Sequence, residues 1–281
     1  IGLGNMGMPM AKNLAIKGHL VVGYDKIKKN EPLIKISEVL SDTASEKDVV
    51  ITMLPDGSSL LEIYSAILGS LTPGTILIDC STVDVQSSVK AAELVKAKGL
   101  KALDAPVSGG IGGAENGTLT FMVGGDTEAF EKVNPLFEIM GQKAVLCGDS
   151  GAGQSVKICN NMILGISMIG VCEAFAMADN LGLDRAKMFD VVSTASGSCW
   201  SINTYCPVPD VGPITPADND YKPGFSTDLM LKDLGLAKTS AEQTNSFTPL
   251  GKEAFAIYKK FYSRGGKGKD FSAILNFIKH S

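Results

Sequence analysis

The stretch that decides the fold opens the chain: Gly2, Leu3, Gly4, Asn5, Met6 and Gly7, which read G-L-G-N-M-G. We expect it to join the end of a strand to a helix that begins near Met8. In such a loop the first glycine permits a tight turn. The second lets a pyrophosphate approach the backbone, and the third lets helix and strand pack closely. The helix N-terminus then offers N–H groups and partial positive charge to the phosphates. By itself this loop is a weak signal.

A carboxylate after the next predicted strand strengthens the interpretation. Asp25 follows the run Leu20–Tyr24 (LVVGY) and lies 18 residues after Gly7, where it can accept hydrogen bonds from both hydroxyls of an adenosine ribose. A carboxylate there repels a 2′-phosphate, and no arginine follows within the next few positions, although Lys26 does. The two features together predict a site for NAD rather than NADP.

Short apolar runs alternate with helical segments through the first half of the chain. The strand candidates after Asp25 are Val49–Leu54, Thr75–Asp79, Lys101–Leu103, Thr118–Val123 and Ala144–Leu146, and the helix candidates are Pro9–Lys17, Ser58–Gly69 and Val85–Lys98. The central runs are rich in Val, Ile and Leu, which is typical of strands buried on both faces of a parallel sheet. The alternation predicts an α/β, Rossmann-type domain over residues 1–150, with a doubly wound, mostly parallel sheet.

Two places in this first domain do not fit the pattern. The glycine loop needs a preceding strand, and the sequence opens at Ile1, so we expect further residues upstream, with any targeting segment among them. Between Asp25 and Val49 only 23 residues remain, where a helix, a strand and another helix are expected. This segment is either a compact variant or a place where residues are missing.

The pattern changes after about Gly151. Gln154–Asn180 reads as one long helix, with apolar or small residues on one face at Ile158, Met162, Gly165, Ile169 and Cys172. Further helical segments are Arg185–Ser193, Thr227–Gln243, Leu250–Ser263 and Phe271–Lys279, and no run alternates with period two. We therefore predict a second, all-α domain over residues 151–281, joined to the first by an interdomain helix at about 154–180.

Composition excludes several classes of function. The chain has 281 residues with a net charge of −4 and no basic run, which argues against nucleic acid as a partner. Its most apolar stretch, residues 162–178, contains Glu173 and several glycines and is too short to span a bilayer comfortably, so no membrane partner is expected. The six cysteines form no C-x-x-C pair, and with only His19 and His280 no zinc site can be assembled. Reduced thiols in an intracellular protein are expected.

Three further segments carry candidate site residues. Leu54, Pro55 and Thr82 follow predicted strands, at the edge where open α/β sheets bind ligands. Leu54 and Pro55 would line the adenosine side and Thr82 would donate to the nicotinamide half, unless they are ordinary strand-end turns. The segment D-A-P-V-S-G-G at 104–110 exposes consecutive backbone amides, with the Ser108 hydroxyl as an extra donor. Such a nest suits a carboxylate, although a plain loop reads the same way.

Lys157 and Asn161 lie four residues apart, hence on one helix face, directly after the glycine-rich hinge 148–153. A lysine on an apolar helix is either snorkelling or functional. Alcohol oxidation needs a base for the hydroxyl proton while hydride leaves for the nicotinamide. The ordinary lysine pKa of ~10.4 is too high for a base, but desolvation and a cationic nicotinamide would both lower it. Asn161 could then hold the hydroxyl or the ammonium in line.

Four segments together resemble the β-hydroxyacid dehydrogenase family. They are G-L-G-N-M-G-M-P-M-A-K-N-L at 2–14, D-A-P-V-S-G-G at 104–110, G-x-x-G-x-G-x-x-x-K-x-x-x-N at 148–161 and K-D-L-G-L-A at 232–237. They occur in the family's order and cover nearly the whole chain. Residues 196–201 (SGSCWS) and 203–209 (NTYCPVP) resemble the branch that oxidises 3-hydroxyisobutyrate to methylmalonate semialdehyde with NAD in valine breakdown. The resemblance implies a homo-oligomer, dimer or tetramer, in the mitochondrial matrix, or otherwise in the cytoplasm.

The resemblance also implies roles for single residues. Lys157 matches the catalytic lysine and Asn161 its partner, while Ser108, Gly109 and Gly110 match the loop that binds the substrate carboxylate. The remaining matches are Lys232 for cofactor and substrate, Leu54, Pro55, Ser59 and Thr82 for the nucleotide, and Trp200, Tyr205 and Phe225 for the acyl pocket or the helical core. Cys206 stands where the branch usually has Asn, which bears on substrate preference, and the short segment after Asp25 bears on the adenine side.

Two alternatives remain open. A sister enzyme on the same scaffold would reduce tartronate or succinate semialdehyde, but it would need polar groups where this chain has Cys199, Trp200 and Val208. A scaffold protein that binds a nucleotide without catalysis would have no use for Lys157. The leading hypothesis is an NAD-dependent dehydrogenase that takes a small 3-hydroxy acid as its substrate.

Overall fold

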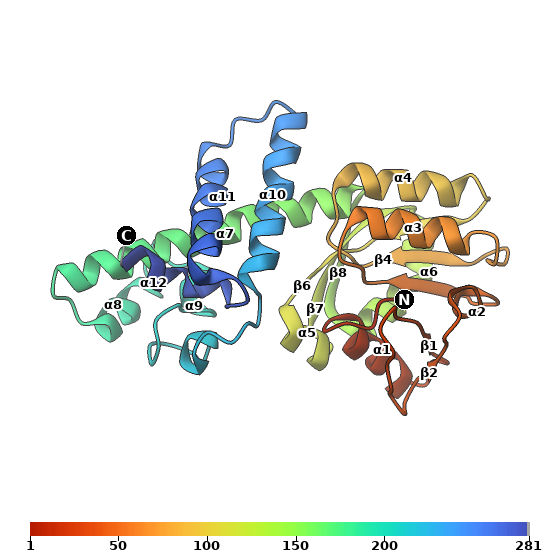
Figure 1. Ribbon diagram of the computed structural model, residues 1–281, viewed down its shortest axis with the longest axis horizontal. Coiled ribbons are helices and arrows are strands. Elements are labelled where there is room, and N and C mark those ends of the chain that lie inside the picture. The colour runs from red at the N-terminus through yellow and green to blue at the C-terminus, as the bar shows by residue number, and fades with distance from the viewer. Residues whose placement is uncertain (280–281) are drawn as a thin grey trace. The chain divides into compact units, whose positions relative to one another are not determined.

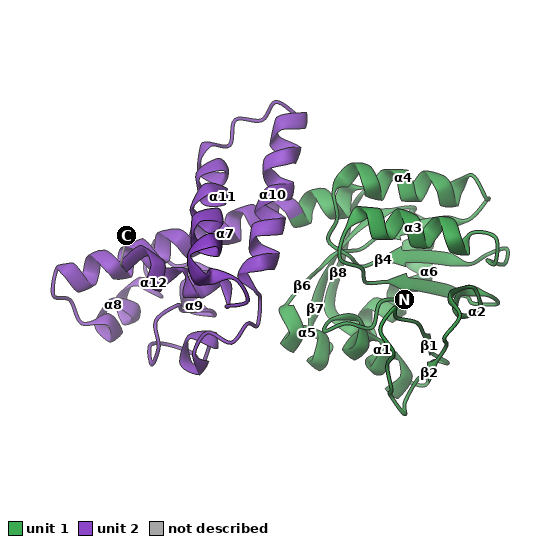
Figure 2. Cartoon of the chain, in the orientation of Figure 1, with its two compact units in different colours: residues 1–157 green, residues 158–281 purple. Residues whose placement is uncertain are grey.

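The computed structural model describes residues 1–279, so His280 lies outside the described residues. The chain divides into two compact units, residues 1–157 and residues 158–281 (Figure 2). The boundary between them falls inside one helix, α7 (Ala152–Asn180).

Unit 1 alternates strands and helices (Figure 1). In chain order it contains α1 (Gly7–Ile16), β1 (Val22–Gly23), β2 (Lys35–Ile36), α2 (Leu40–Ala44), β3 (Val49–Thr52), α3 (Gly57–Ile67), β4 (Ile76–Asp79), α4 (Val85–Lys96), β5 (Lys101–Asp104), β6 (Val107–Ser108), α5 (Gly110–Asn116), β7 (Leu119–Gly125), α6 (Thr127–Met140), β8 (Gly141–Gly148) and the start of α7.

The main sheet of unit 1 has the strand order β3-β4-β5-β7-β6, with β8 also paired to β7. Strands β3, β4 and β5 run parallel, as do β7 and β8, whereas β7 runs antiparallel to β5 and β6. The short strands β1 and β2 form a separate parallel pair. The predicted Rossmann-type, mostly parallel sheet is confirmed.

Alternate side chains of the central strand β4 explain the helices on both faces of this sheet. Ile76 and Ile78 belong to the buried cluster that includes Met10 of α1 and Phe137 of α6. Leu77, between them, belongs to a second cluster with residues of α3 and α4. Successive side chains of a strand point to opposite faces, so an unbroken apolar run needs a cover on each side. This is why the run reads as apolar throughout rather than alternating.

Three segments of unit 1 differ from the prediction. Helix α6 (Thr127–Met140) was not among the predicted helices. In place of the expected helix, strand and helix after Asp25, the chain forms only β2 and the five-residue α2 before β3. The stretch 104–110 is not a plain loop, because Val107–Ser108 pairs with β7 and Gly110 begins helix α5. Glycines at 109, 110, 112 and 113 give that helix a low intrinsic propensity, which hides it in the sequence.

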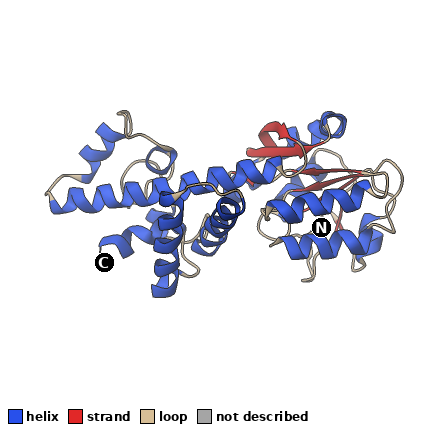
Figure 3. Ribbon diagram, turned by 90° about the horizontal axis from the view of Figure 1, so that it is seen from above, coloured by secondary structure: helices blue, strands red, loops and turns tan. Residues whose placement is uncertain are grey.

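Unit 2 is helical (Figure 3). It contains the rest of α7, then α8 (Arg185–Val192), α9 (Trp200–Asn203), η1 (Pro216–Asn219), α10 (Thr227–Gln243), α11 (Pro249–Phe261), η2 (Tyr262–Gly266), η3 (Phe271–Ala273) and α12 (Ile274–Lys279). Among its described residues there is no strand, only a single bridge between Ser226 and Asp270. The predicted helical C-terminal half is confirmed.

Helix α7 forms the centre of unit 2. Its Phe175 is buried in one cluster with Tyr258 of α11 and Phe271 of η3. A Cβ on Gly165 would lie 3.0 Å from the side chain of Leu234, so the small residue lets α10 approach α7 closely. By length and composition α7 could cross a membrane, and 44% of its most apolar window is buried inside the fold. Its Met168, Cys172 and Phe175 belong to the buried core cluster of unit 2.

A buried carboxyl joins the ends of two strands in unit 1. Asp79, the last residue of β4, accepts hydrogen bonds from the Thr52 hydroxyl at 2.7 Å, and from the Ser81 hydroxyl and amide. All three bonds go to Oδ1, and Oδ2 has no hydrogen-bond partner in the described part of the chain. Burial raises the pKa of Asp79 from 3.8 to about 6 despite these hydrogen bonds, and the neighbouring Asp104 adds to the rise.

We therefore expect the Asp79→Asn variant to have a flatter dependence of stability on pH. Between about pH 4 and pH 6 the folded chain holds a proton on Asp79 that the unfolded chain has lost, so stability falls as pH rises through this window. Asparagine keeps the oxygen that accepts the three bonds and never ionises. Urea unfolding at pH 4 to 7 should show that the variant loses about 1–3 kcal/mol less than wild type over this range.

The exposed Asp190→Asn variant is the matched control for the loss of one carboxyl, and its stability profile should follow that of wild type. Identical slopes for Asp79→Asn and wild type would show that Asp79 does not titrate in this window.

Candidate active site

The three glycines of the first loop have different surroundings. Gly2 has φ +88°, and a Cβ there would lie 2.2 Å from the carbonyl oxygen of Met53. A Cβ on Gly7 would lie 1.9 Å from the carbonyl oxygen of Gly2. Gly4, in contrast, is exposed, and a Cβ there would meet nothing within 4 Å. The protein's own packing thus requires the first and third glycines, while the second faces open space in which a ligand can approach the backbone.

Helix α1 begins directly after this loop. Its N-cap residue Met6 makes no side-chain capping bond, and the first turn contains no acidic residue. The positive end of the helix therefore receives no compensating charge from its own first turn, as at helix ends that bind phosphate. The helix begins at Gly7, within one residue of the predicted start at Met8.

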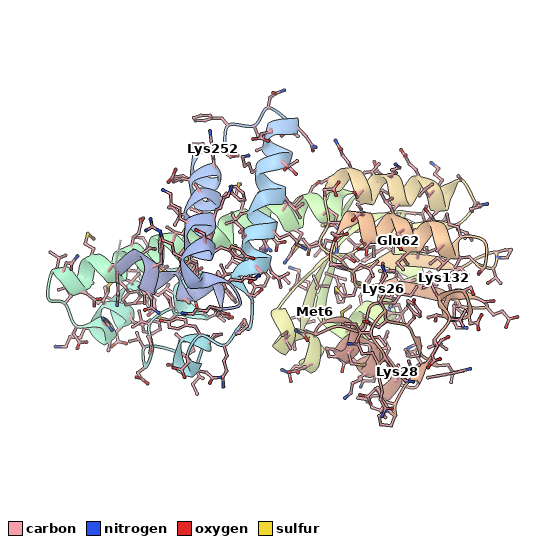
Figure 4. All side chains as sticks on the ribbon, in the orientation of Figure 1. Met6, Lys26, Lys28, Glu62, Lys132 and Lys252 are labelled. Carbon is pink, nitrogen blue, oxygen red and sulfur yellow. The ribbon has the colours of Figure 1, made fainter. Side chains whose placement is uncertain are left out.

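Asp25 is fastened to the glycine loop. Its Oδ2 accepts a hydrogen bond from the amide of Leu3 at 2.7 Å, and its Oδ1 accepts one from the amide of Ile27 at 2.8 Å. The following residue, Lys26, forms an exposed ion pair with Glu62 of α3 at 3.5 Å, and Figure 4 shows the two side chains. The carboxylate thus lies beside the loop, and Lys26, the cation that follows it directly, already faces an acidic partner.

The ends of β3 and β4 are tied together by Ser81. Its hydroxyl accepts a hydrogen bond from the amide of Leu54 at 2.7 Å and donates one to Asp79. Pro55 is exposed after Leu54, and Thr82 is half-buried after Ser81. Ser59 lies in the first turn of α3, where its amide donates to Asp56 at 2.8 Å. The structure therefore brings the predicted residues Leu54 and Thr82 to adjoining strand ends.

A second buried carboxylate holds the start of α7. Asp104 ends β5, and its two oxygens accept hydrogen bonds from the amides of Gly151 at 2.7 Å and Gln154 at 2.9 Å. Burial raises the pKa of Asp104, while these amides act in the opposite direction. A Cβ on Gly153 would lie 2.2 Å from the carbonyl oxygen of Met122, so the helix start packs directly against β7. Asp104 was not predicted as a helix cap, because its partners lie 47 and 50 residues further along the chain.

Lys157 follows this capped start along α7. It is 6% exposed, which is unusual for a lysine, and it makes further interactions within the fold. The predicted carboxylate-binding residues sit at another helix start: Ser108 ends β6, Gly109 has φ +134° at the N-cap of α5, and Gly110 is the first residue of that helix. The backbone amides at 108–110 thus belong to a strand-to-helix turn.

In unit 2, two predicted residues meet through a third that was missed. The Asn161 side-chain amide donates to Oδ2 of Asp233, and Lys232 lies 3.7 Å from Oδ1 of Asp233. Asn161 and Asp233 are both buried. The sequence signal for Asp233 was its place directly after Lys232 in the K-D-L-G-L-A segment.

The three predicted aromatic residues form one cluster in unit 2. Trp200, which is 49% exposed, stacks on Tyr205 with ring centroids 4.9 Å apart. Tyr205 and Phe225 both contact the ring of Phe271, at 5.4 Å and 5.6 Å. The Tyr205 hydroxyl donates to Asp270 at 2.9 Å. Phe271 is part of the helical core, while the half-exposed Trp200 leaves one side of the cluster open.

Comparisons with known families assign both halves of the chain. Residues 1–148 match the NAD binding domain of 6-phosphogluconate dehydrogenase. Residues 151–278 match the family described as the NAD-binding domain of NADP-dependent 3-hydroxyisobutyrate dehydrogenase.

Curated relatives match nearly the whole chain. A probable 3-hydroxyisobutyrate dehydrogenase of Mycobacterium tuberculosis is 43% identical, over 99% of this chain and 96% of its own length. The mitochondrial 3-hydroxyisobutyrate dehydrogenase of Homo sapiens is 44% identical, over 99% of this chain and 85% of its own length.

Solved structures agree with these matches. The structure of Mycobacterium tuberculosis 3-hydroxyisobutyrate dehydrogenase with L-serine has a TM-score of 0.93 at 43% identity, covering 99% of this chain and 97% of that one. A 3-hydroxyisobutyrate dehydrogenase from Salmonella typhimurium has a TM-score of 0.82 at 26% identity, covering 98% and 97%. With the two family matches and these relatives, the chain belongs to the β-hydroxyacid dehydrogenase family and is an NAD-dependent dehydrogenase.

Proposed function

We propose that this dehydrogenase oxidises 3-hydroxyisobutyrate to methylmalonate semialdehyde, with Lys157 as the base that takes the hydroxyl proton. The observation that carries the proposal is the burial of Lys157 on a helix whose start is fixed to the edge of the sheet by Asp104. The names of relatives at 43–45% identity support the substrate. We further propose a place for the reaction in valine breakdown.

The residues present fit NAD. The glycine loop would hold the pyrophosphate at the open side of Gly4, and Asp25 would accept from the ribose hydroxyls. The other residues that we assign to the cofactor are Gly2, Leu3, Asn5, Met6, Gly7, Leu54, Pro55, Ser59, Thr82 and Lys232. When bound, NAD supplies the acceptor for hydride.

The chain's own residues handle the proton and the substrate's acid group. Burial disfavours the charged form of a lysine, so Lys157 can take up the hydroxyl proton of the alcohol. At the same time hydride leaves the carbon that bears the hydroxyl, and the C–O bond becomes a carbonyl. The alcohol is oxidised, NAD is reduced, and the proton is left on the lysine amine. Asn161, one turn further along α7, would orient the hydroxyl or the amine. Backbone amides at Ser108, Gly109 and Gly110 would bind the carboxylate.

We assign further substrate contacts to Lys232 and to the cluster of Trp200, Tyr205 and Phe225. The exposed side of Trp200 offers apolar surface that would line an acyl pocket. The domain roles follow: residues 1–150 bind the dinucleotide, and residues 151–281 serve the substrate and assembly.

We propose that the protein forms a homo-oligomer, a dimer or a tetramer, through α7. Ile163 and Met177 are each 62% exposed, and Gly170 lies midway between them with open space at its Cβ position. These three residues recur every seven positions, so they form one stripe along the helix. The exposed Glu173 lies beside this stripe. Apolar side chains exposed on a helix that otherwise lies in the core are suited to a second copy of the same chain.

We propose that the compartment of the protein depends on the type of cell from which it comes. Mammalian relatives carry the word mitochondrial in their names, and mycobacterial relatives of equal identity do not. The mitochondrial matrix is thus the expected place in an animal cell and the cytoplasm in a bacterium, which fractionation of the source cell tests.

The proposed reaction predicts both substrate preference and the effect of losing Lys157. NADH absorbance should rise fastest with 3-hydroxyisobutyrate when serine and tartronate-related acids are offered side by side. Lys157→Ala should lower turnover by at least about 10²–10⁴-fold, the usual effect of removing a general base. Its affinity for NAD should stay within about twofold of wild type, because the glycine loop belongs to other elements.

The exposed Lys187→Ala variant in α8 is the control for removing one lysine, and it should turn over like wild type. Near-wild-type turnover by Lys157→Ala would remove the lysine from the mechanism.

The glycine loop gives a second prediction, in which two alanine substitutions separate ligand binding from folding. Gly4→Ala should leave the unfolding temperature within about 1 °C of wild type, because nothing in the protein meets the new methyl group. It should weaken NAD binding by about tenfold or more, because the methyl group enters the space reserved for the pyrophosphate. Gly7→Ala should lower the unfolding temperature itself. If Gly4→Ala binds NAD as tightly as wild type, the pyrophosphate lies elsewhere.

The oligomer proposal is checked by light scattering on the eluting protein. The mass should be two or four times the 29.5 kDa of one chain. Met177→Glu, which places a charge in the α7 stripe, should shift the mass towards one chain, whereas Lys187→Glu on α8 should not. A wild-type protein of single-chain mass at micromolar concentration would contradict the proposal.

A further inference from the structure

Gln154 of α7 bonds to two segments of unit 1 at once, residues 81–83 and Asp104. It is fully buried, with no exposed surface, and is the third residue of the helix. Its side-chain Oε1 accepts a hydrogen bond from the amide of Val83 at 3.1 Å, and its Nε2 donates to the carbonyl oxygen of Ser81 at 2.8 Å. Its backbone amide donates to Asp104.

The two side-chain bonds enclose Thr82, the residue assigned to the nicotinamide half of the cofactor. Ser81 in turn bonds through its hydroxyl to the amide of Leu54 and to Asp79. A displacement of Gln154 would therefore act on both strand ends that border the proposed cofactor site. Lys157 follows Gln154 by three residues, close to one helical turn, so the two residues project from the same side of α7.

We infer that Gln154 is a positioning residue for the reaction. It fixes the first turns of α7 against residues 81–83, both in rotation about the helix axis and in position along it. In this way it sets the place of the Lys157 amine beside the nicotinamide. The inference rests on the proposed function of Lys157. Gln154 touches neither substrate nor cofactor in this scheme and acts through Lys157 and Thr82.

The chemistry of the two bonds explains why this position needs an amide. One end of the side chain must accept from an N–H and the other must donate to a carbonyl, and the glutamine amide does both. An ionised glutamate can only accept, and its second oxygen would face the Ser81 carbonyl. A methionine fills a similar volume but leaves the Val83 amide and the Ser81 carbonyl without these partners in a buried place.

The test compares Gln154→Met and Gln154→Glu with the exposed Gln86→Met of α4 as control. At neutral pH we expect kcat to fall by about 10–100-fold in both variants, since small misplacement of a catalytic group has effects of this size. The KM for 3-hydroxyisobutyrate should change less than about threefold, because its carboxylate is bound by residues 108–110. Gln86→Met should behave like wild type.

The glutamate variant supplies a readout that loss of stability alone would not give. A protonated glutamic acid has one O–H donor and one carbonyl acceptor, so it can restore both bonds. The ratio of kcat for Gln154→Glu to kcat for wild type should rise as the pH is lowered, whereas the ratio for Gln154→Met should stay flat. Taking the ratio removes the titration of Asp79, Asp104 and Lys157, which wild type shares. Circular dichroism at each pH confirms that the variants are folded.

The outcomes separate this inference from the proposed function. If Lys157→Ala is inactive while Gln154→Met and Gln154→Glu keep wild-type kcat at every pH, the inference is wrong and the proposed function stands. A folded Gln154→Glu whose kcat ratio does not change with pH also overturns the inference, even where Gln154→Met fails to fold. If Lys157→Ala is fully active, the proposed function itself fails.

Discussion

The carboxylate of Asp104 is the constraint on which the candidate site depends. It ends a central strand and binds the two amides at the start of α7, so one side chain joins the sheet to the helix that carries Lys157. Burying a carboxylate is costly, but its bonds are charge-assisted and lie at the positive end of a 29-residue helix. Gly153 allows the close contact, because any side chain there would collide with β7. Together with the bonds of Gln154 to residues 81–83, this cap places the lysine-bearing helix at the strand ends.

At the carboxyl ends of the strands, some residues serve the packing of the protein and their neighbours face the proposed cofactor site. Gly2 and Gly7 serve the packing of the loop, and Gly4 between them faces outward. Asp79 and Ser81 tie β3 to β4, while Gln154 ties those ends to α7. The groups that would touch the cofactor are thus held by a second set of buried polar residues. Fixed polar groups of this kind need little rearrangement during the reaction.

The sequence predicted those features that local patterns encode. Spacing and composition predict the glycine loop, the strands that are apolar on both faces, and the long helix through Lys157 and Asn161. The structure has all three. The sequence did not predict Asp104 as a cap, Gln154 as a bridge or Asp233 as the partner of Asn161. These bonds join residues 47 to 73 positions apart. Helix α5 was also missed, since its glycines favour a loop on propensity alone.

The central claim is that a buried primary amine stands beside the reacting alcohol. A crystal structure of the chain with NAD and 3-hydroxyisobutyrate bound would test it most directly. The account predicts the Lys157 Nζ within about 3.2 Å of the alcohol oxygen, or joined to it by one water. An Nζ held away from that oxygen, with another group in hydrogen-bond reach of it, would contradict the account.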